Sequence, residues 1–358
     1  MTAVGILGVA AYLPTEIRTN DYWPESVARA WRERALQKHE STQRHLEADG
    51  SRAALASLKA IREIGPDPFH GSKERRAMPP GMKVWDMETI AAREAIERAG
   101  IAKEEIDLVL GYQMIPDYIN VPSGMVVHHN LGLNERCTTM QIDAVCNSFM
   151  AQLTMAQAMI QSGHARYALL TQGCGLATNL PPSGEQVDLG SGDGATAVVV
   201  GPVSERRGIL TYSHHTLGSK WGALVCGAPG KHWAQDRCVA YSEDRAAGFD
   251  MISNIVHRAE MVVTEALTEA KLKPEDVDFY ACHQPFKWFR PASIDAIGLT
   301  KAKSVCHFPF TASLSAANIP LQLAMGEKEG LLRPGDLTAF FQGGTGSTVS
   351  GMTLRWGR

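Results

Sequence analysis

Two residues in this chain combine a reactive side chain with a position that could support nucleophilic chemistry, Cys146 and His283. Cys146 stands between segment 138–142, which is typical of a buried strand, and segment 149–160, where apolar residues recur at helical spacing. The free N–H groups and the positive dipole end of a helix N-terminus stabilise a thiolate relative to a thiol. The sequence therefore predicts a reactive thiol at position 146, with a small buried structural cysteine as the alternative.

An internal repeat indicates how the chain positions these two residues. Segment 95–109 aligns without a gap on segment 266–280, an offset of 171 residues (266 − 95). A second match follows in the same order around Gly163 and Gly330, with an offset of 167 residues (330 − 163). Two ordered matches favour a duplicated architecture. We therefore predict two similar α/β halves, residues 1–202 and 203–358.

The two offsets assign counterparts to the candidate residues. Adding 167 to Cys146 gives Ser313, and adding 171 to Tyr112 gives His283. Ligands of parallel sheets collect at the carboxyl ends of strands, so we expect these positions to approach one axis. The sequence thus predicts a Cys–His pair drawn from opposite halves. The alternative for His283 is a core histidine with satisfied ring nitrogens.

Composition narrows the class of protein. The chain has 358 residues, and its 35 basic and 38 acidic side chains leave a net charge of −3, which gives no electrostatic basis for nucleic-acid binding. No apolar run approaches the ~18 residues of a membrane span. Seven cysteines without a CxxC pair fit neither a disulfide framework nor a zinc site. We expect a cytoplasmic protein with no metal, no membrane and no nucleic-acid partner.

Five short motifs resemble those of the thiolase-fold condensing enzymes, most closely the ketoacyl-ACP synthase III (KAS III) branch and its acyltransferase-like relatives. In chain order, they are Asp143–Cys146, Gly192–Ala197, Cys282–Gln284, Ser315–Pro320 and Gly343–Gly346. The resemblance covers about residues 85–358. Residues 20–82 match poorly, and we predict that they form a helical insertion or lid.

The resemblance implies a thiolase-like five-layered αβαβα fold built from two duplicated halves, and a homodimer. It implies that Cys146 carries an acyl thioester and that His283 acts as acid or base. It also implies an oxyanion hole formed by the N–H groups of Cys146 and Gly346. The acyl donor would be acyl-CoA or a phosphopantetheinyl acyl carrier protein, and no cofactor would stay bound.

One position departs from the family pattern. Decarboxylating members carry an Asn two residues before the Ser-Ala-Ala segment, and here that residue is Ser313. A hydroxyl offers one donor where an amide offers two, so malonyl decarboxylation is in doubt. Asn318 could be the third member of a Cys–His–Asn triad, its carbonyl accepting from the imidazole N–H. The alternative for Asn318 is a residue of the first helical turn that bonds the backbone.

Other residues match places where family members contact substrates. Arg75 and Arg76 stand where basic residues meet the phosphates of phosphopantetheine or a nucleotide, and Lys287 could dock an acidic carrier protein. A solvated loop and simple packing are the respective alternatives. Tyr118 and Val121 lie in the loop that relatives insert across the dimer interface, so they are candidate residues lining the acyl pocket.

These observations favour an acyltransferase in which Cys146 takes an acyl group and His283 activates a small-molecule acceptor. The Ser313 change favours specialised metabolism over the start of fatty-acid synthesis. Two alternatives stay open: decarboxylative ketosynthesis from malonyl-ACP, and a non-catalytic thiolase-fold subunit of a heterodimer.

Overall fold

The chain folds into two helix-covered β-sheets, seen in a computed structural model that describes residues 2–180, 190–345 and 348–357. The first sheet has the strand order β1-β7-β6-β4-β5 and the second has the order β11-β12-β13-β8. The strands of the first sheet are β1 (Val4–Tyr12), β4 (Ile106–Met114), β5 (Thr138–Gln141), β6 (Tyr167–Gly175) and β7 (Asp193–Pro202). Those of the second are β8 (Gly208–Thr216), β11 (Phe279–Cys282), β12 (Leu337–Gly344) and β13 (Thr348–Arg355).

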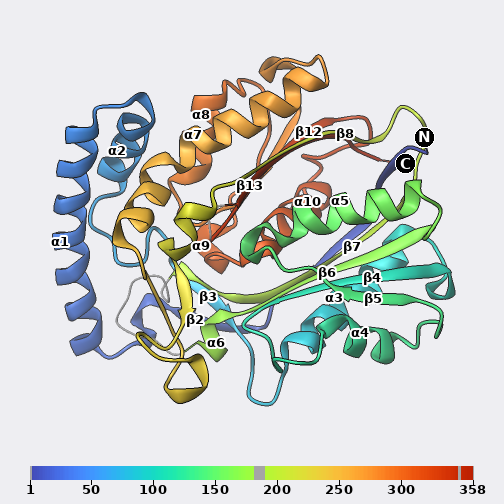
Figure 1. Cartoon of the computed structure of the whole chain (residues 1–358), viewed down its shortest axis with the longest axis horizontal. Helices are drawn as coiled ribbons and strands as arrows, with labels where there is room; N and C mark the ends of the chain where they lie inside the picture. Colours follow the sequence, from blue (N-terminus) through green and yellow to red (C-terminus); the bar gives the residue numbers. More distant parts are fainter. Residues whose placement is uncertain (1, 181–189, 346–347, 358) are drawn as a thin grey trace.

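Helices cover both sheets and fill the space between them (Figure 1). The central pair is α5 (Ser148–Gln161) and α10 (Asn318–Lys328), whose apolar faces share one core with strands of both sheets. The first sheet is covered outside by α3 (Val84–Ala99) and α4 (Ser123–Leu131). The second is covered by α7 (Arg245–Glu269) and α8 (Phe289–Ile297). This arrangement confirms the predicted five-layered αβαβα fold with two duplicated halves.

A glycine lets a helix lie directly on a strand in each half. A Cβ on Gly8 of β1 would lie 2.4 Å from the carbonyl oxygen of Ala95 in α3. A Cβ on Gly351 of β13 would lie 2.3 Å from the carbonyl oxygen of Val262 in α7. Both distances are far below contact, so each helix can approach its sheet this closely only because the strand residue has no side chain.

The structure corrects the counterpart of Cys146. A short 3₁₀ turn precedes each central helix: Val145–Asn147 before α5 and Ser315–Ala317 before α10, an offset of 170 (315 − 145). The first residue of each turn has a positive φ, 53° at Val145 and 54° at Ser315. The counterpart of Cys146 is therefore Ala316, and the assignment to Ser313 was wrong. The offset of 167 applies only after the ends of these two helices, because α10 has 11 residues and α5 has 14.

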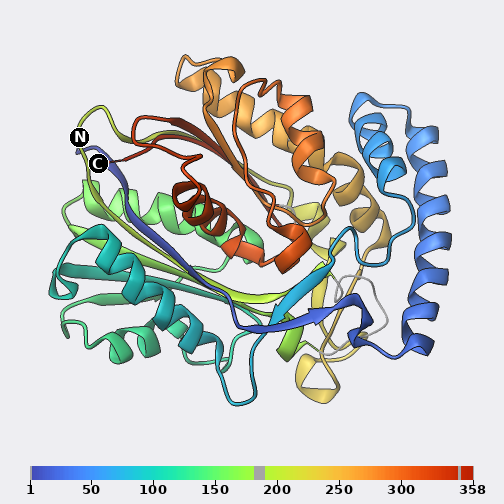
Figure 2. The same cartoon turned by 180° about the vertical axis from the view of Figure 1, so that it is seen from behind.

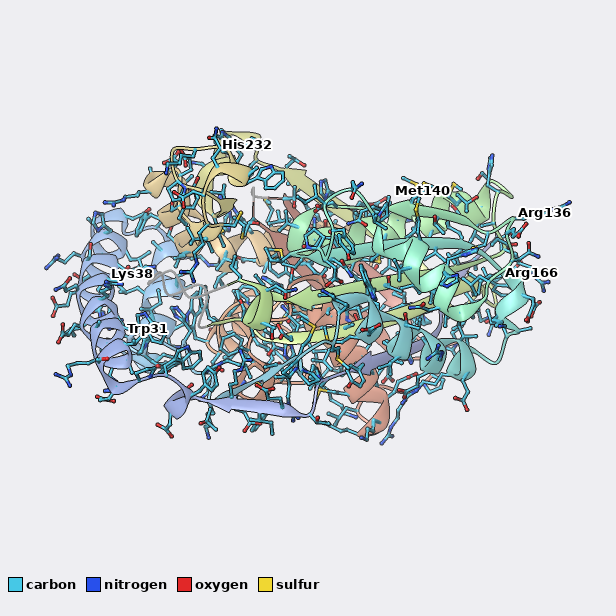
Figure 3. All side chains as sticks on the ribbon, turned by 90° about the horizontal axis from the view of Figure 1, so that it is seen from below. Trp31, Lys38, Arg136, Met140, Arg166 and His232 are labelled. Atoms are coloured by element: carbon cyan, nitrogen blue, oxygen red, sulfur yellow. The ribbon has the colours of Figure 1, made fainter. Side chains whose placement is uncertain are left out.

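The poorly matching segment 20–82 contains two antiparallel helices, α1 (Glu25–Asp49) and α2 (Arg52–Ile64). They stand at one edge of the molecule, where α2 packs against α7 and α8 while α1 lies outermost (Figure 2). Trp31 and Lys38 mark α1 at the opposite end of the molecule from Arg136 and Arg166 (Figure 3). The segment is helical as predicted, and its helices lie beside the second half.

Two small ribbons complete the fold. The strands β2 (Glu16–Thr19) and β3 (Glu74–Ala77) pair at the two ends of the helical insertion, and β9 (Val225–Gly227) pairs with β10 (Val239–Tyr241) ahead of α7. The short helices α6 (Leu176–Asn179) and α9 (Phe308–Thr311) follow β6 and precede α10, respectively.

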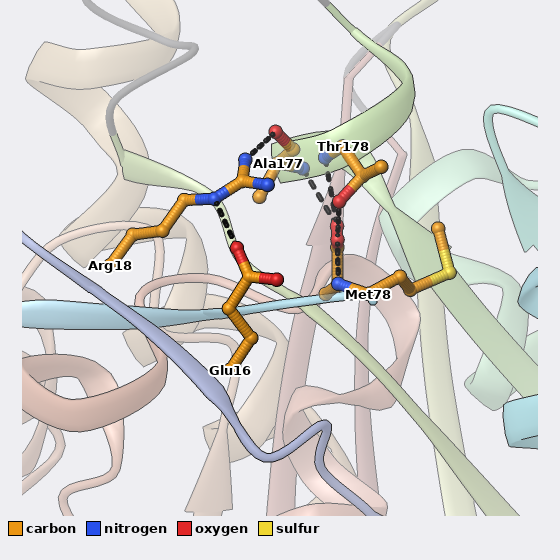
Figure 4. A network of polar contacts seen from close by, with 6 residues as sticks. Glu16, Arg18, Met78, Ala177 and Thr178 are labelled. Atoms are coloured by element: carbon orange, nitrogen blue, oxygen red, sulfur yellow. Dashed lines mark hydrogen bonds and ion pairs between the residues drawn. The ribbon is translucent and has the colours of Figure 1, made fainter. Parts of the chain in front are cut away.

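Asp193, at the start of β7, ties several of these pieces together (Figure 4). Its buried carboxylate accepts hydrogen bonds from the backbone N–H groups of Met78 at 2.9 Å and Ala177 at 2.8 Å, and from the Thr178 hydroxyl. Arg18 of β2 donates to the carbonyl of Ala177 at 3.1 Å. The motif that resembles the family at residues 192–197 therefore joins β7 to the β2–β3 ribbon and to α6.

Candidate active site

Cys146 lies in the 3₁₀ turn between β5 and α5, at the predicted handover from strand to helix. The turn is held by short bonds: the Val145 N–H donates to Asp143 Oδ1 at 2.8 Å, and the Ser148 hydroxyl accepts from the Ala144 N–H at 2.8 Å. Cys146 itself is half-buried. Its Sγ accepts a hydrogen bond from Ser315 Oγ at 3.3 Å, so the turns of the two halves touch through these side chains.

The electrostatic surroundings of Cys146 differ from the expectation of a thiol activated by its helix. Burial raises the pKa of the Cys146 thiol above its usual value, and Asp143 pushes it in the same direction. Hydrogen bonds from the Ser315 hydroxyl and from the backbone N–H groups of Thr345 and Cys146 act against burial without overcoming it. Burial and Asp143 therefore act in the direction opposite to the stabilisation that a helix N-terminus gives a thiolate.

His283 follows β11 and is held by Asn318, the first residue of α10. Asn318 Nδ2 lies 2.8 Å from His283 Nδ1, while Asn318 Oδ1 accepts the backbone N–H of Leu314 at 2.8 Å. A backbone N–H can only donate, so the amide oxygen faces Leu314 and the NH₂ group faces the ring. The expectation that the Asn318 carbonyl accepts from the imidazole was therefore wrong.

This orientation sets the tautomer of His283. Burial lowers the pKa of His283 to about 4, so the ring is neutral near pH 7. Since Nδ1 accepts from Asn318, the ring hydrogen sits on Nε2. His283 thus presents a hydrogen-bond donor through Nε2.

Ser313 joins the same cluster. Its Oγ accepts from Asn318 Nδ2 at 3.1 Å, and within the described part of the chain its own hydroxyl hydrogen has no acceptor. The cluster around the second turn therefore contains His283, Ser313 and Asn318, while Cys146 reaches this turn through Ser315. Sequence reasoning named four of these five residues, and it missed the contact of Ser315 because Ser315 appeared only as part of a motif.

A second buried histidine, His307, was missed entirely. Burial, with His283 nearby, lowers its pKa to about 3. Its Nδ1 lies 2.8 Å from Thr311 Oγ1, and its Nε2 is a buried ring nitrogen without a partner among the described residues. Thr311 can donate its hydroxyl hydrogen to the carbonyl of Ala312 at 2.8 Å, which leaves His307 Nδ1 as the donor. No sequence motif marks His307.

The predicted phosphate-binding residues have different surroundings. Arg75 is 1% exposed, donates to Asn20 Oδ1 at 2.7 Å, and lies over the Trp23 ring at 4.7 Å. Arg76 is half-buried and donates to the carbonyl of Pro14 at 3.3 Å. Both arginines belong to β3, and neither contacts Cys146 or His283 within the described residues.

Lys287 is exposed and lines a cavity of about 510 Å³ between α2, α7 and α8. Tyr118 is 55% exposed and stacks on Trp85 at 5.4 Å, and Val121 is half-buried in the same loop. Gly346, the predicted second oxyanion donor, lies outside the described residues. Within those residues, no cluster of side chains suited to a metal ion is found, and no helix is long and apolar enough to cross a membrane.

Two family models for 3-oxoacyl-[acyl-carrier-protein] synthase III match this chain. One covers residues 140–218, around Cys146, and the C-terminal model covers residues 267–356, around His283. Over these residues the chain is similar to the KAS III branch of the thiolase-fold enzymes. It is 29% identical to a β-ketoacyl-ACP synthase III of Halalkalibacterium halodurans over 288 residues, 80% of this chain and 88% of that protein.

Solved structures of this family have the same fold. The 3-oxoacyl-ACP synthase III of Aquifex aeolicus is 25% identical, with a TM-score of 0.77 over 99% of this chain and 100% of that one. The priming β-ketosynthase of the R1128 polyketide pathway is 22% identical, with a TM-score of 0.79 over 99% of this chain and 96% of that one. The chain is thus a KAS III-like condensing enzyme.

Proposed function

We propose that Cys146 takes an acyl group from acyl-CoA or an acyl carrier protein and passes it to a nucleophilic small-molecule acceptor in specialised metabolism. One observation carries the proposal. The contacts Ser315–Cys146 and Asn318–His283 bring a sulfur from the first half and a buried imidazole from the second half to the same pair of turns. Retention of both groups disfavours the non-catalytic subunit.

In the proposed acylation, the Cys146 thiolate attacks the thioester carbonyl carbon. The carbon–sulfur bond to the donor then breaks, and the departing thiolate takes up the proton that Cys146 released. Backbone N–H groups of Cys146 and of the loop after β12 would hold the oxyanion. The role of Gly346 as the donor from this loop stays a prediction. The thioester itself needs no bound cofactor.

The tautomer of His283 favours a role as a hydrogen-bond donor. With hydrogen on Nε2 and Nδ1 engaged by Asn318, the neutral ring cannot accept a proton at Nε2 from an acceptor molecule. His283 would instead donate to the carbonyl oxygen on which negative charge develops. This geometry favours an acceptor that is nucleophilic without help from His283, such as an acidic carbon, and it revises the expectation that His283 activates the acceptor as a base.

Decarboxylative condensation with malonyl-ACP is a second candidate, favoured by the free hydroxyl hydrogen of Ser313. Ser313 Oγ accepts from Asn318, which leaves its hydrogen available to a ligand beside His283. The two donors could together hold an enolate oxygen in place of the usual amide. The likeness to a polyketide priming ketosynthase supports the specialised role for either acceptor.

Intact-protein mass spectrometry after incubation with a panel of acyl-CoA and acyl-ACP thioesters tests the proposal. We expect one acyl group per chain, located at Cys146 by peptide mapping, and no gain of mass in Cys146→Ala. Absence of acylation in the wild-type protein with every thioester would favour the non-catalytic subunit. Release of labelled carbon dioxide from malonyl thioester would favour the decarboxylative candidate.

We also propose that the protein is a homodimer joined near the loop between β4 and α4. In this loop Tyr118 is 55% and Ile119 is 71% exposed, and neighbouring exposed apolar side chains can mark a protein–protein interface. Sedimentation analysis should give the mass of a dimer, and Ile119→Asp should shift it toward the monomer. A wild-type protein that sediments as a monomer would contradict this assignment.

A further inference from the structure

A buried tyrosine lies behind the nucleophile on the first sheet. Tyr112 of β4 is 1% exposed, and its hydroxyl lies 3.4 Å from Ser315 Oγ. Ser315 is 2% exposed and lies 3.3 Å from Cys146 Sγ. The three side chains therefore form a continuous line of polar atoms that ends on the reacting sulfur.

The direction of hydrogen bonding along this line follows from the number of hydrogens. Ser315 has one hydroxyl hydrogen and donates it to Cys146, so Ser315 Oγ can only accept from Tyr112. The Tyr112 hydroxyl has one hydrogen, and Met114 Sδ at 3.2 Å, a weak acceptor, competes with Ser315 Oγ at 3.4 Å for it. A donor that is itself donating becomes a better acceptor, so the Tyr112–Ser315 bond strengthens when negative charge forms on the sulfur.

We propose that Tyr112 and Ser315 form a hydroxyl relay that stabilises the Cys146 thiolate. Ser315 is a catalytic residue in this proposal, because it touches the reacting sulfur. Tyr112 is a positioning residue, because it acts on the sulfur through Ser315. The proposal rests on the role of Cys146 as nucleophile and adds two residues to it.

The surroundings of Cys146 explain why neutral donors matter. The titratable groups that act on the thiol are Asp143 beside it in the chain, Tyr112 from β4 and Cys174 from β6. None of these brings positive charge, and His283 is neutral with its hydrogen on Nε2. Stabilisation of the thiolate therefore comes from hydrogen-bond donors, of which Ser315 supplies the one from a side chain among the described residues.

A second pair in the molecule provides a matched control. Tyr280 of β11 is also fully buried, and its hydroxyl donates to Ser293 Oγ at 3.3 Å. Ser293 then donates to the backbone carbonyl of Arg290 at 3.0 Å, and both Tyr280 and Ser293 also hydrogen-bond the buried Cys282 thiol, which is not the proposed nucleophile. The two tyrosine–serine pairs have nearly the same geometry and burial, and they differ in the cysteine that they reach: Cys146 for the first pair and Cys282 for the second.

The test measures the rate of iodoacetamide alkylation of Cys146 against pH, with peptide mass spectrometry to separate the cysteines. The exposed Cys226 serves as an internal reference for the reagent. For Ser315→Ala we expect the pH midpoint to rise by about one unit and the rate at pH 7.5 to fall about tenfold, the loss of one hydrogen bond to a charged atom. For Tyr112→Phe we expect a fall of about threefold.

The control variants Tyr280→Phe and Ser293→Ala should leave the midpoint of Cys146 unchanged. The relay is wrong if Ser315→Ala has the midpoint of the wild type, or if Tyr112→Phe behaves as Tyr280→Phe does. Tyr112→Phe removes only the hydroxyl group and keeps the ring in place, so the test remains possible if Ser315→Ala fails to fold. Alkylation needs no acyl donor: a wild type that is alkylated at Cys146 but never acylated would contradict the proposed function and leave the relay standing.

Discussion

The turn that carries Cys146 and its counterpart in the other half are built alike and do different work. In the first, the Ala144 N–H donates to Ser148 Oγ at 2.8 Å, and in the second, the Leu314 N–H donates to Asn318 Oδ1 at 2.8 Å. Ser148 and Asn318 are both the first residue of a central helix, 170 positions apart (318 − 148). The same local bond thus closes both turns.

The difference lies in what remains after that bond is made. The Ser148 hydroxyl has one hydrogen, which it donates to the carbonyl of Val145 at 2.7 Å. The Asn318 amide still has its NH₂ group, which reaches His283 and Ser313. An asparagine in place of a serine therefore lets the second turn hold a neighbouring imidazole while it closes itself. The first turn presents a sulfur, and the second positions His283 and Ser313.

The largest effect should come from Asn318→Asp. One carboxylate oxygen can still accept from the Leu314 N–H. The other can only accept, so the neutral His283 ring would carry its hydrogen on Nδ1 and have none on Nε2. We expect acyl transfer from pre-acylated Cys146 to slow by about 10³- to 10⁴-fold, the scale of a histidine held in the wrong tautomer. Loss of the acyl mass with time measures this step.

Asn318→Ser is the matched control, because it copies the first turn. It should keep the bond to Leu314 and lose the NH₂ donor to His283 and Ser313, slowing transfer by about 10²-fold. If Asn318→Asp transfers as fast as the wild type, then the orientation of the ring does not govern the reaction. Nitrogen NMR of His283 can verify the tautomer in each variant.

Two buried residues, Glu88 of the first half and His283 of the second, should respond oppositely to pH. His283 has its pKa lowered by burial to about 4, so the unfolded chain binds a proton that the folded chain refuses. Stability from this residue is present above pH 6.5 and falls by about 3 kcal/mol as pH drops toward 4. Glu88 of α3 has its pKa raised by burial to about 8, so its contribution is full below pH 4.5 and falls by roughly 4 kcal/mol as pH rises to 8.

Urea denaturation across pH 4 to 9 measures both trends. Glu88→Gln should reduce the fall in the free energy of unfolding at alkaline pH. His307→Phe should reduce part of the fall at acid pH, because burial lowers the pKa of His307 to about 3. A variant at Glu88 that changes the acid side alone would contradict the assignment. The bonds that Thr171 and Gln113 donate to Glu88, at 2.8 and 2.7 Å, lower its pKa and so act against the effect of burial.

A smaller effect is expected when the first turn loses its closing bond. Ser148→Ala removes the acceptor of the Ala144 N–H and the donor to Val145, and should lower the free energy of unfolding by about 1 kcal/mol. Ser162→Ala, at the other end of α5, is the control, because its exposed hydroxyl closes no turn at the site. Equal losses in the two variants would show that the first turn needs no such bond.

The smallest effect concerns the helical insertion. Arg52 of α2 pairs with Glu260 of α7 at 2.9 Å, with the arginine side chain 82% exposed. Exposed pairs contribute little, so Arg52→Ala should change the free energy of unfolding by at most about 0.5 kcal/mol. Ser57, whose buried hydroxyl donates to the Ser253 carbonyl at 3.0 Å, makes the informative comparison. Ser57→Val should cost more than Arg52→Ala, and the reverse order would mean that the insertion is held by charge.

The fold could be predicted because its signals are local and repeated. Apolar strands, helical spacing and ordered motifs each point to the same layered arrangement, and the insertion stood out by its polar helices. The counterpart of Cys146 could not be predicted, because a helix three residues shorter in the second half changes the offset from 170 to 167. An offset measured after the helices cannot be applied before them unless the start and the length of each helix are known.

Within the site, residue types could be predicted, and their orientation could not. The motifs identified Cys146, His283, Ser313 and Asn318, but the direction of the Asn318 amide depends on the backbone N–H of Leu314. The pKa of the Cys146 thiol likewise depends on burial, which opposes the helix N-terminus. Both outcomes are set by competing contacts from separate segments, which no pattern along the chain describes.

Val145, immediately before Cys146, has a left-handed backbone with φ of 53° although its side chain is β-branched. This conformation is costly for valine, and it persists because bonds from its neighbours outweigh the cost. The backbone at Cys146 is consequently shaped before any acyl donor arrives. In the proposed acylation, binding energy from the donor need not be used to shape the turn, and it remains available to bring the thioester carbonyl to the sulfur.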